Sequence, residues 1–206
     1  MSFGKPGRPR EDRLLRQREI FGAVAPLVLE RGARRVTMRD AARAAYLSVG
    51  ALYHYFPTKR DLYVAGLREI ADELVERVTS LPRDVAPIDR LRNGLDAYLD
   101  HISQHSRAYV SLMRGGIGSD PEVAAVVEGV RRRLTENFLE QTPFAHMLAP
   151  DPRFQIAMRG WIGFCEGATI DWCANPRMSR VEMRDLLTQI LGSIMTVVAP
   201  QVLQAK

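Results

Sequence analysis

Residues 37 to 61 constrain the fold of this chain most, because a helix-start signal is repeated within a short stretch. Thr37 stands three residues before Asp40, and Thr58 stands three residues before Asp61. A hydroxyl followed by a carboxylate at this spacing satisfies the unpaired N–H groups at the start of a helix. Ser48 offers a third start between these two. The spacing therefore predicts two short helices followed by the beginning of a third.

The residues between these starts predict how the two short helices pack. Small and apolar side chains there allow one helix to cross another at close range. They are Ala41, Ala42, Ala44, Ala45, Leu47 and Leu52. Two short helices that cross in this way form a helix-turn-helix, the motif that places its second helix in the major groove of DNA.

A longer pattern runs through the same stretch: a threonine, a small-residue helix, a turn, Ser-x-Gly-x-Leu-Tyr, an aromatic residue, Phe, and Thr-Lys. It consists of Thr37, Ala42, Ser48, Gly50, Leu52, Tyr53, Phe56, Thr58 and Lys59. The pattern, within residues 12–70, resembles that of the tetracycline-repressor (TetR) family of bacterial transcriptional regulators. This resemblance implies an all-α fold, with an N-terminal three-helix helix-turn-helix domain and a C-terminal helical domain for ligand binding and dimerisation.

Three positions depart from the family pattern. Tyr46 stands where the family usually has the turn glycine, so we expect a left-handed or otherwise unusual backbone conformation there. Val28 stands where a core Phe is usual, and His54-Tyr55 reverses the commoner order of an aromatic residue followed by His. None of these changes removes a polar contact that the fold needs, so they bear on base reading.

Charge is unevenly divided along the chain. Residues 1–60 hold 13 Lys and Arg against 5 Asp and Glu, whereas residues 61–206 hold 16 against 19. A basic excess that coincides with a helix-turn-helix predicts binding to nucleic acid. We expect three parts: a basic N-terminal arm over residues 1–11, a helix-turn-helix domain over residues 12–62, and an effector-binding and dimerisation domain over residues 63–206.

The remainder of the sequence predicts further helices and no strand. Asp120-Pro121 and Asp151-Pro152 each combine an N-cap with a first-turn proline, and Ser179 with Glu182 caps the last helix. The apolar stretches fall far short of the ~20 residues that a membrane-spanning helix requires, and the N-terminus lacks the apolar region of a signal peptide. We therefore expect a cytoplasmic protein with no membrane partner.

Phosphate contacts are expected at helix N-termini, where exposed N–H groups favour anions. Thr37, Ser48 and Lys59 stand at such ends, and Tyr53 and Tyr55 can add hydroxyl donors. The resemblance implies that these positions contact the DNA backbone. The alternatives are that Tyr53 packs against the first helix and that Lys59 is simply solvated.

Base reading is expected from the second helix of the motif and from Arg39. A guanidinium at Arg39 can bind guanine O6 and N7 together, while Val49 and Ala51 can contact a thymine methyl group. Gly50 lets the backbone approach closely, and His54 can donate or accept a hydrogen bond or else remain solvated.

The segment from Gly4 to Arg10 is rich in Pro, Gly and basic residues, which predicts a disordered arm. Gly7-Arg8-Pro9 resembles the core of AT-hook peptides, so Arg8 and Arg10 are candidates for the narrow minor groove of A·T tracts. The alternative is a basic tail that only adds electrostatic attraction.

Helix-turn-helix proteins of this size need two copies to cover enough DNA, so we expect a homodimer. The last two helices are the candidates, because Gly160, Gly163 and Gly167 form a stripe along which another helix can approach. The resemblance implies an effector pocket with a lipophilic lining, although these side chains could equally form an ordinary core. The predicted lining is Tyr98, Ile102, Tyr109, Met113, Phe138, Trp161, Phe164 and Trp172. Arg159, Glu166 and Asp171 would be polar anchors there, or Arg159 and Glu166 would instead pair across the dimer.

His101 and His105 lie four residues apart, which is the spacing of a two-histidine metal site. A metal-responsive regulator is thus an alternative, but the site needs further ligands, and two surface histidines occur at this spacing by chance. The sequence has no G-x-S-x-G, phosphate-binding loop or dinucleotide fingerprint, so an enzyme is disfavoured and no cofactor is expected. We therefore expect a sequence-specific, ligand-responsive repressor, released from a palindromic DNA operator by a small lipophilic effector.

Overall fold

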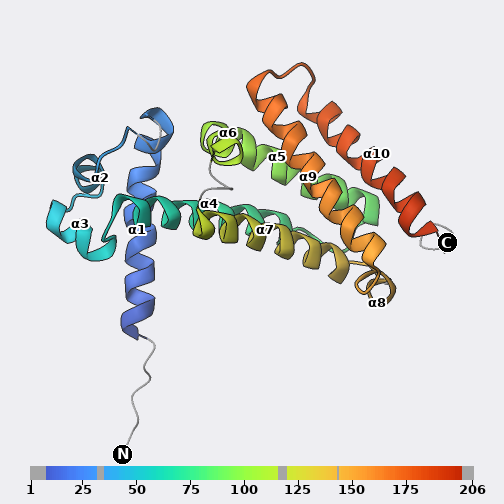
Figure 1. Cartoon of the computed structure of the whole chain (residues 1–206), viewed down its shortest axis with the longest axis horizontal. Coiled ribbons are helices and arrows are strands. Elements are labelled where there is room, and N and C mark those ends of the chain that lie inside the picture. Colours follow the sequence, from blue (N-terminus) through green and yellow to red (C-terminus); the bar gives the residue numbers. More distant parts are fainter. Residues whose placement is uncertain (1–7, 32–34, 116–119, 143, 201–206) are drawn as a thin grey trace, which may run out of the picture. The chain divides into compact units, whose positions relative to one another are not determined.

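The computed structural model describes residues 8–31, 35–115, 120–142 and 144–200, and within these ranges the chain is helical with no strand (Figure 1). The helices are α1 (Arg8–Arg31), α2 (Met38–Ala44), α3 (Val49–Tyr55), α4 (Lys59–Thr79), α5 (Pro87–Gln104), α6 (Ser106–Gly115), α7 (Pro121–Glu140), α8 (Ala145–Leu148), α9 (Pro152–Ala174) and α10 (Arg180–Val198). The predicted all-α fold is confirmed.

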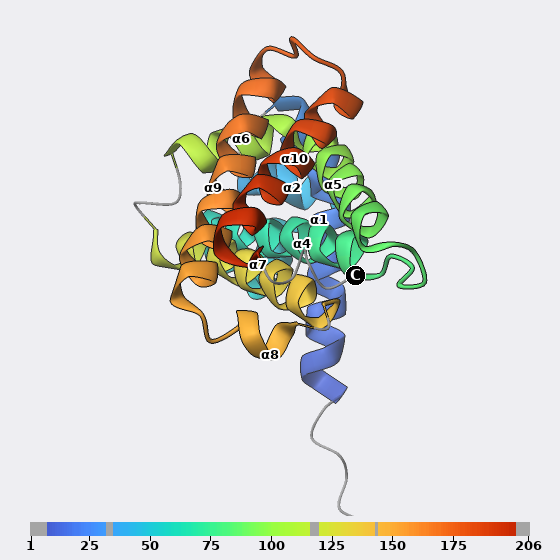
Figure 2. The same cartoon turned by 90° about the vertical axis from the view of Figure 1, so that its right-hand side faces the viewer.

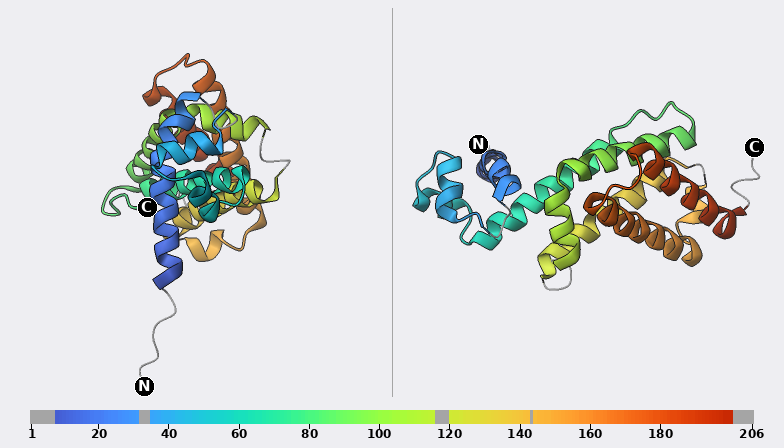
Figure 3. Two further views of the ribbon diagram at one scale, coloured as in Figure 1. Left: turned by 90° about the vertical axis from the view of Figure 1, so that its left-hand side faces the viewer. Right: turned by 90° about the horizontal axis from the view of Figure 1, so that it is seen from above.

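The chain forms two compact units, Met1–Ile70 and Ala71–Lys206. The first unit contains α1, α2, α3 and the start of α4, seen in blue to cyan in Figure 3. The second contains the rest of α4 and the helices from α5 to α10. The division falls inside α4, which is one continuous helix.

The three predicted helix starts in the first unit are confirmed. The Thr37 hydroxyl accepts from the Asp40 backbone N–H at 3.1 Å, and the Asp40 carboxylate accepts from the Thr37 backbone N–H at 3.0 Å. Thr58 and Asp61 make the same reciprocal pair at 3.1 and 2.8 Å. The Ser48 hydroxyl accepts from a backbone N–H of α3 at 3.1 Å. Each of these three helices therefore begins at its capping residues.

Packing stabilises α2 and α3, because an isolated helix of seven residues is unstable in water. Ala41 and Ala42 are buried on α2, where their small side chains let α1 and α3 pack closely. Leu52 and Phe56 enter the same core from α3 and its C-cap. Core positions from the other helices are Ile20, Val24, Val36, Met38, Ala45 and Leu62.

The start of α1 corrects the predicted arm. The helix begins at Arg8, so the segment Arg8–Arg10 forms its first turn and is not extended. Pro9 fits there because the first turn of a helix has no use for its missing N–H, and its fixed φ suits a helix. Residues 1–7 lie outside the described residues, and only the backbone of Arg8 and Arg10 is described.

The second unit is built around α9 and α10, which run side by side in opposite directions (Figure 2). Helix α10 also packs against α5, while α6 and α7 pack against α9. The predicted caps are present, with Asp120, Asp151 and Ser179 each accepting backbone N–H groups at the start of α7, α9 and α10. Two apolar clusters fill the interior, one around Phe154 and Leu191 and the other around Leu99 and Leu187.

Among the described residues, none of the helices combines the length and the apolar character that crossing a membrane requires.

Candidate DNA-binding site and effector region

Helix α3 has one buried and one exposed side. Leu52 is buried, whereas Val49, Gly50, Tyr53 and His54 are exposed. Arg39, in the first turn of α2, is exposed as well, and Ala51 is half-buried. The residues predicted to read bases are therefore accessible within the basic first unit, as a DNA-reading helix requires.

The residues predicted to contact phosphates differ in whether their hydrogen-bond donors are already used within the protein. Thr37, Ser48 and Lys59 are exposed at the starts of α2, α3 and α4. The Thr37 hydroxyl donates to the Asp40 carboxylate at 2.6 Å, and its hydrogen bonds lower the pKa of Asp40. Its donors are thus engaged in the cap. Tyr53 is 45% exposed, which favours contact with DNA over packing.

Tyr55 and the C-terminal end of α3 are held by α1, a feature that the sequence did not reveal. Tyr55 packs partly against the core of the first unit. The Arg13 guanidinium donates to the His54 carbonyl at 3.2 Å, and the Gln17 amide donates to the Tyr55 carbonyl at 3.0 Å. These bonds satisfy terminal carbonyls of α3 and orient it on α1.

Tyr46 adopts φ 56°, so the predicted left-handed turn is confirmed. The Tyr46 N–H donates to the Arg43 carbonyl at 3.2 Å, and the Leu47 N–H donates to the Ala42 carbonyl at 2.8 Å. These two bonds form a Schellman motif, which ends α2 and reverses the chain towards α3. The tyrosine ring is 96% exposed. The turn of the helix-turn-helix therefore carries backbone strain that glycine would avoid.

In the second unit, some of the predicted lining residues come together. Tyr98, Trp161 and Trp172 pack against the apolar cluster around Leu99 and Leu187. The hydroxyls of Tyr98 and Tyr109 are hydrogen-bonded at 2.9 Å. Burial raises the pKa of both tyrosines above the usual value, so both stay protonated at physiological pH.

Other predicted lining residues lie elsewhere. Phe138 stacks on Phe154, with ring centroids 6.2 Å apart, in the other apolar cluster, which Trp161 also borders. Phe164 is 41% exposed on α9 and does not belong to the interior. Ile102 is buried and Met113 is half-buried.

Arg159 and Glu166 each form an ion pair with another residue of the chain. Arg131 on α7 donates to the two Glu166 oxygens at 2.7 and 2.5 Å, and Arg159 binds Glu128 at 2.9 and 2.8 Å. Glu166 raises the pKa of Arg131, as expected for a close ion pair. Arg159 and Glu166 are thus each joined to α7 within the chain.

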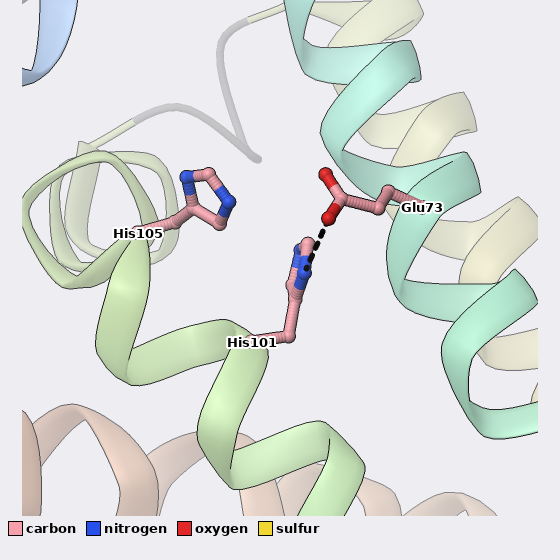
Figure 4. Close-up of side chains that lie close together, drawn as sticks. All are labelled: Glu73, His101 and His105. Carbon is pink, nitrogen blue, oxygen red and sulfur yellow. Dashed lines mark ion pairs between the residues drawn. The ribbon is translucent and has the colours of Figure 1, made fainter. Parts of the chain in front are cut away.

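The two histidines also depart from the prediction. His101 is fully buried on α5, and His105 is half-buried at its C-cap, so they are not a surface pair. Glu73 of α4 lies beside them, with its Oε1 3.9 Å from His101 Nδ1 (Figure 4). One ligand atom from each of the three residues lies within 4.8 Å of the others.

A small basic helix-turn-helix unit joined to a larger helical unit is the architecture of a DNA-binding transcriptional regulator. Residues 23–66 match the description "Bacterial regulatory proteins, tetR family", and residues 87–193 match "Tetracyclin repressor-like, C-terminal domain". The chain belongs to the TetR family. It is a transcriptional regulator and not an enzyme, as predicted.

Solved structures agree with this assignment. A TetR-family regulator from Streptomyces coelicolor superposes with a TM-score of 0.78 at 28% identity, covering 90% of this chain and 82% of that chain. FadR from Thermus thermophilus, solved in complex with lauroyl-CoA, has a TM-score of 0.62 at 18% identity and covers 87% and 94%. The latter likeness is one of fold.

Curated relatives include the HTH-type transcriptional activator FasR from Mycolicibacterium smegmatis, which is 29% identical over 129 residues, or 62% of this chain. The match spans 58% of FasR, less than two thirds of its length. The HTH-type transcriptional regulator BetI from Stenotrophomonas maltophilia is 29% identical over 157 residues, covering 74% of this chain and 79% of BetI.

Proposed function

We propose that this regulator is a repressor that binds a palindromic operator as a homodimer and is released by a lipophilic effector. The observation that carries the proposal is the exposed side of α3, with capped helix starts around it, within the basic first unit. The bases are contacted by Arg39, Val49, Gly50, Ala51 and His54. Among these, the Arg39 guanidinium hydrogen-bonds to a guanine. The phosphate contacts come from Ser48, Tyr53, Tyr55 and Lys59, while Thr37 serves as the N-cap of α2.

The outer side of α9 and α10 is the proposed dimer surface. A Cβ added at Gly160, Gly163 or Gly167 would meet no atom within 4 Å, so the stripe of glycines faces open space. Large apolar side chains accompany it, with Ile156 75% and Val197 77% exposed. A second copy would cover these groups and allow the close helix approach that small residues permit.

The effector proposal is carried by the tyrosine pair. Tyr98 packs with Trp161 against the same apolar cluster, and its hydroxyl is hydrogen-bonded to that of Tyr109. Such a setting suits a ligand with a large apolar body and a single polar group. The complex of FadR with lauroyl-CoA shows that a protein of this fold accepts an acyl chain with a polar head. We therefore propose an acyl compound, contacted by Tyr98, Tyr109 and Trp161.

The experiment begins with selection of bound fragments from the source genome. Fluorescence anisotropy then measures operator affinity as a function of salt and of acyl-CoA or fatty-acid concentration. We expect a palindromic site, affinity that falls linearly on a log–log salt plot, and release by acyl compounds. Operator DNA should weaken effector binding by the same factor by which effector weakens DNA binding. Salt-insensitive binding would contradict the DNA proposal, and equal effector affinities with and without operator would contradict the switch.

A further inference from the structure

Three metal-ligand side chains meet in the second unit. His101 and His105 come from the end of α5, and Glu73 comes from α4 (Figure 4). Their rings and carboxylate point towards one another, with the two imidazole centroids 4.7 Å apart. Because the helices bring together residues 28 positions apart in the sequence, the cluster is a product of the fold.

The distances are close to those that a metal ion imposes. Two imidazole nitrogens and a carboxylate oxygen around a tetrahedral Zn²⁺ at about 2.1 Å would lie about 3.4 Å from one another. The His101 Nδ1 to Glu73 Oε1 distance is already 3.9 Å, and all three ligand atoms lie within 4.8 Å. Side-chain rotations that shift the ligand atoms by about 1 Å would complete the tetrahedral geometry, without movement of either helix.

The burial of the cluster also suits a metal. His105 Nδ1 is buried and has no hydrogen-bond partner among the described residues, a costly arrangement that a bound ion would relieve. Glu73 is only half-buried and gives the cluster an opening to solvent.

Arg77 would compete with a metal ion for the Glu73 carboxylate. Its guanidinium donates to Glu73 Oε1 at 3.0 and 2.8 Å, and it also binds Asp100 at 3.4 Å. Carboxylates that bind metals are themselves commonly hydrogen-bonded, and such partners orient the ligand. The positive charge of Arg77 lowers affinity for a dication, while the link to Asp100 offsets part of that charge.

We propose that Glu73, His101 and His105 form a Zn²⁺ site with one open coordination position. Two imidazoles and one carboxylate are ligands that Zn²⁺ prefers, and three protein ligands leave the fourth position for water. Structural zinc sites are closed by four protein ligands, whereas a site of this kind stays open to a further ligand. The proposal rests on the cluster itself and not on the identity of the effector.

The test uses untagged full-length protein and Co²⁺ as a spectroscopic substitute for Zn²⁺. The variants are Glu73→Gln and His105→Gln, with Glu76→Gln on α4 and His146→Gln on α8 as matched controls at exposed positions. Circular dichroism of each apo variant establishes that it folds. Glu73→Gln changes a half-exposed side chain, so it keeps the test valid if a histidine variant unfolds.

We expect wild-type protein to bind one equivalent of Co²⁺ with the visible absorption of a tetrahedral nitrogen and oxygen site, and Zn²⁺ to displace it. Each ligand variant should lose at least about tenfold in affinity, since even partners that only orient a ligand contribute that much. The controls should bind like wild type. Absence of stoichiometric binding, undiminished binding by both ligand variants, or a thiolate charge-transfer band from Cys165 or Cys173 would overturn the proposal.

Discussion

Replacing Tyr46 by glycine should stabilise the helix-turn-helix unit, although it removes a large aromatic side chain. The residue sits in the left-handed conformation at φ 56°, and its ring is 96% exposed. Two backbone hydrogen bonds of the Schellman motif hold this conformation in place. Glycine can adopt the same conformation without steric cost and can keep both bonds, because they come from the backbone.

The expected gain is the difference between two opposing effects. A left-handed conformation costs a non-glycine residue roughly 1–2 kcal/mol. Glycine, in turn, gains freedom in the unfolded chain, which costs roughly 0.4–1 kcal/mol of stability. Loss of the exposed ring changes little, since it buries almost no surface. The net expectation is a gain of ~1 kcal/mol in the free energy of unfolding.

Hydrogen exchange measured by mass spectrometry is the suitable assay, because it reports on the first unit alone. In the regime where exchange follows the opening equilibrium, ~1 kcal/mol slows exchange about fivefold in peptides covering residues 37–56. Tyr46→Ala is the matched control, since it removes the ring and keeps the strained Cβ. Equal protection in the two variants, or faster exchange in Tyr46→Gly than in wild type, would refute the reasoning.

Three further predictions concern the proposed contacts. Arg39→Ala should cost ~1–3 kcal/mol of operator affinity and relax the choice at one base pair, whereas Lys59→Ala should weaken operator and random DNA alike, as measured by anisotropy. Gly163→Leu should dissociate the dimer in sedimentation experiments, because the added side chain would block the close approach of the second copy. Helix content should stay unchanged, because a Cβ at this position faces open space within the chain. Tyr109→Phe should lower the free energy of unfolding in urea by about 0.5–1.5 kcal/mol, since the part-buried Tyr98 hydroxyl loses its hydrogen bond to Tyr109.

Local signals in the sequence predict the helix starts, because those features depend on neighbouring residues. The capping boxes at Thr37 and Ser179 each follow from a few adjacent side chains. The left-handed Tyr46 follows instead from the resemblance to the TetR pattern, in which glycine stands at this turn. The start of α1 was placed too late, since a Pro- and Arg-rich segment has the composition of an arm. Pro9 is compatible with both states, so composition alone does not separate them.

Contacts between distant helices were beyond the reach of the sequence. The interior of the second unit contains many apolar side chains at helical spacing, so its division into two clusters, with Phe138 in one and Tyr98 in the other, depends on how the helices cross. Spacing identified the two histidines, but not their burial or the nearby Glu73. In the same way, Arg159 and Glu166 share a helix face, yet their partners lie on α7.

The bond from Gln17 to the Tyr55 carbonyl leads to a last prediction, which links α1 to the recognition helix. Gln17→Ala removes the donor and should cost about 0.5–1.5 kcal/mol in the stability of the first unit. Because α3 has seven residues, this loss frays its C-terminal end and weakens specific operator binding more than random binding. Gln17→Lys keeps a donor and should retain most of the affinity, whereas Gln17→Glu offers only acceptors and should behave like Gln17→Ala. Anisotropy with operator and random duplexes measures the difference, and equal affinities for the Lys and Ala variants would show that this hydrogen bond does not position α3.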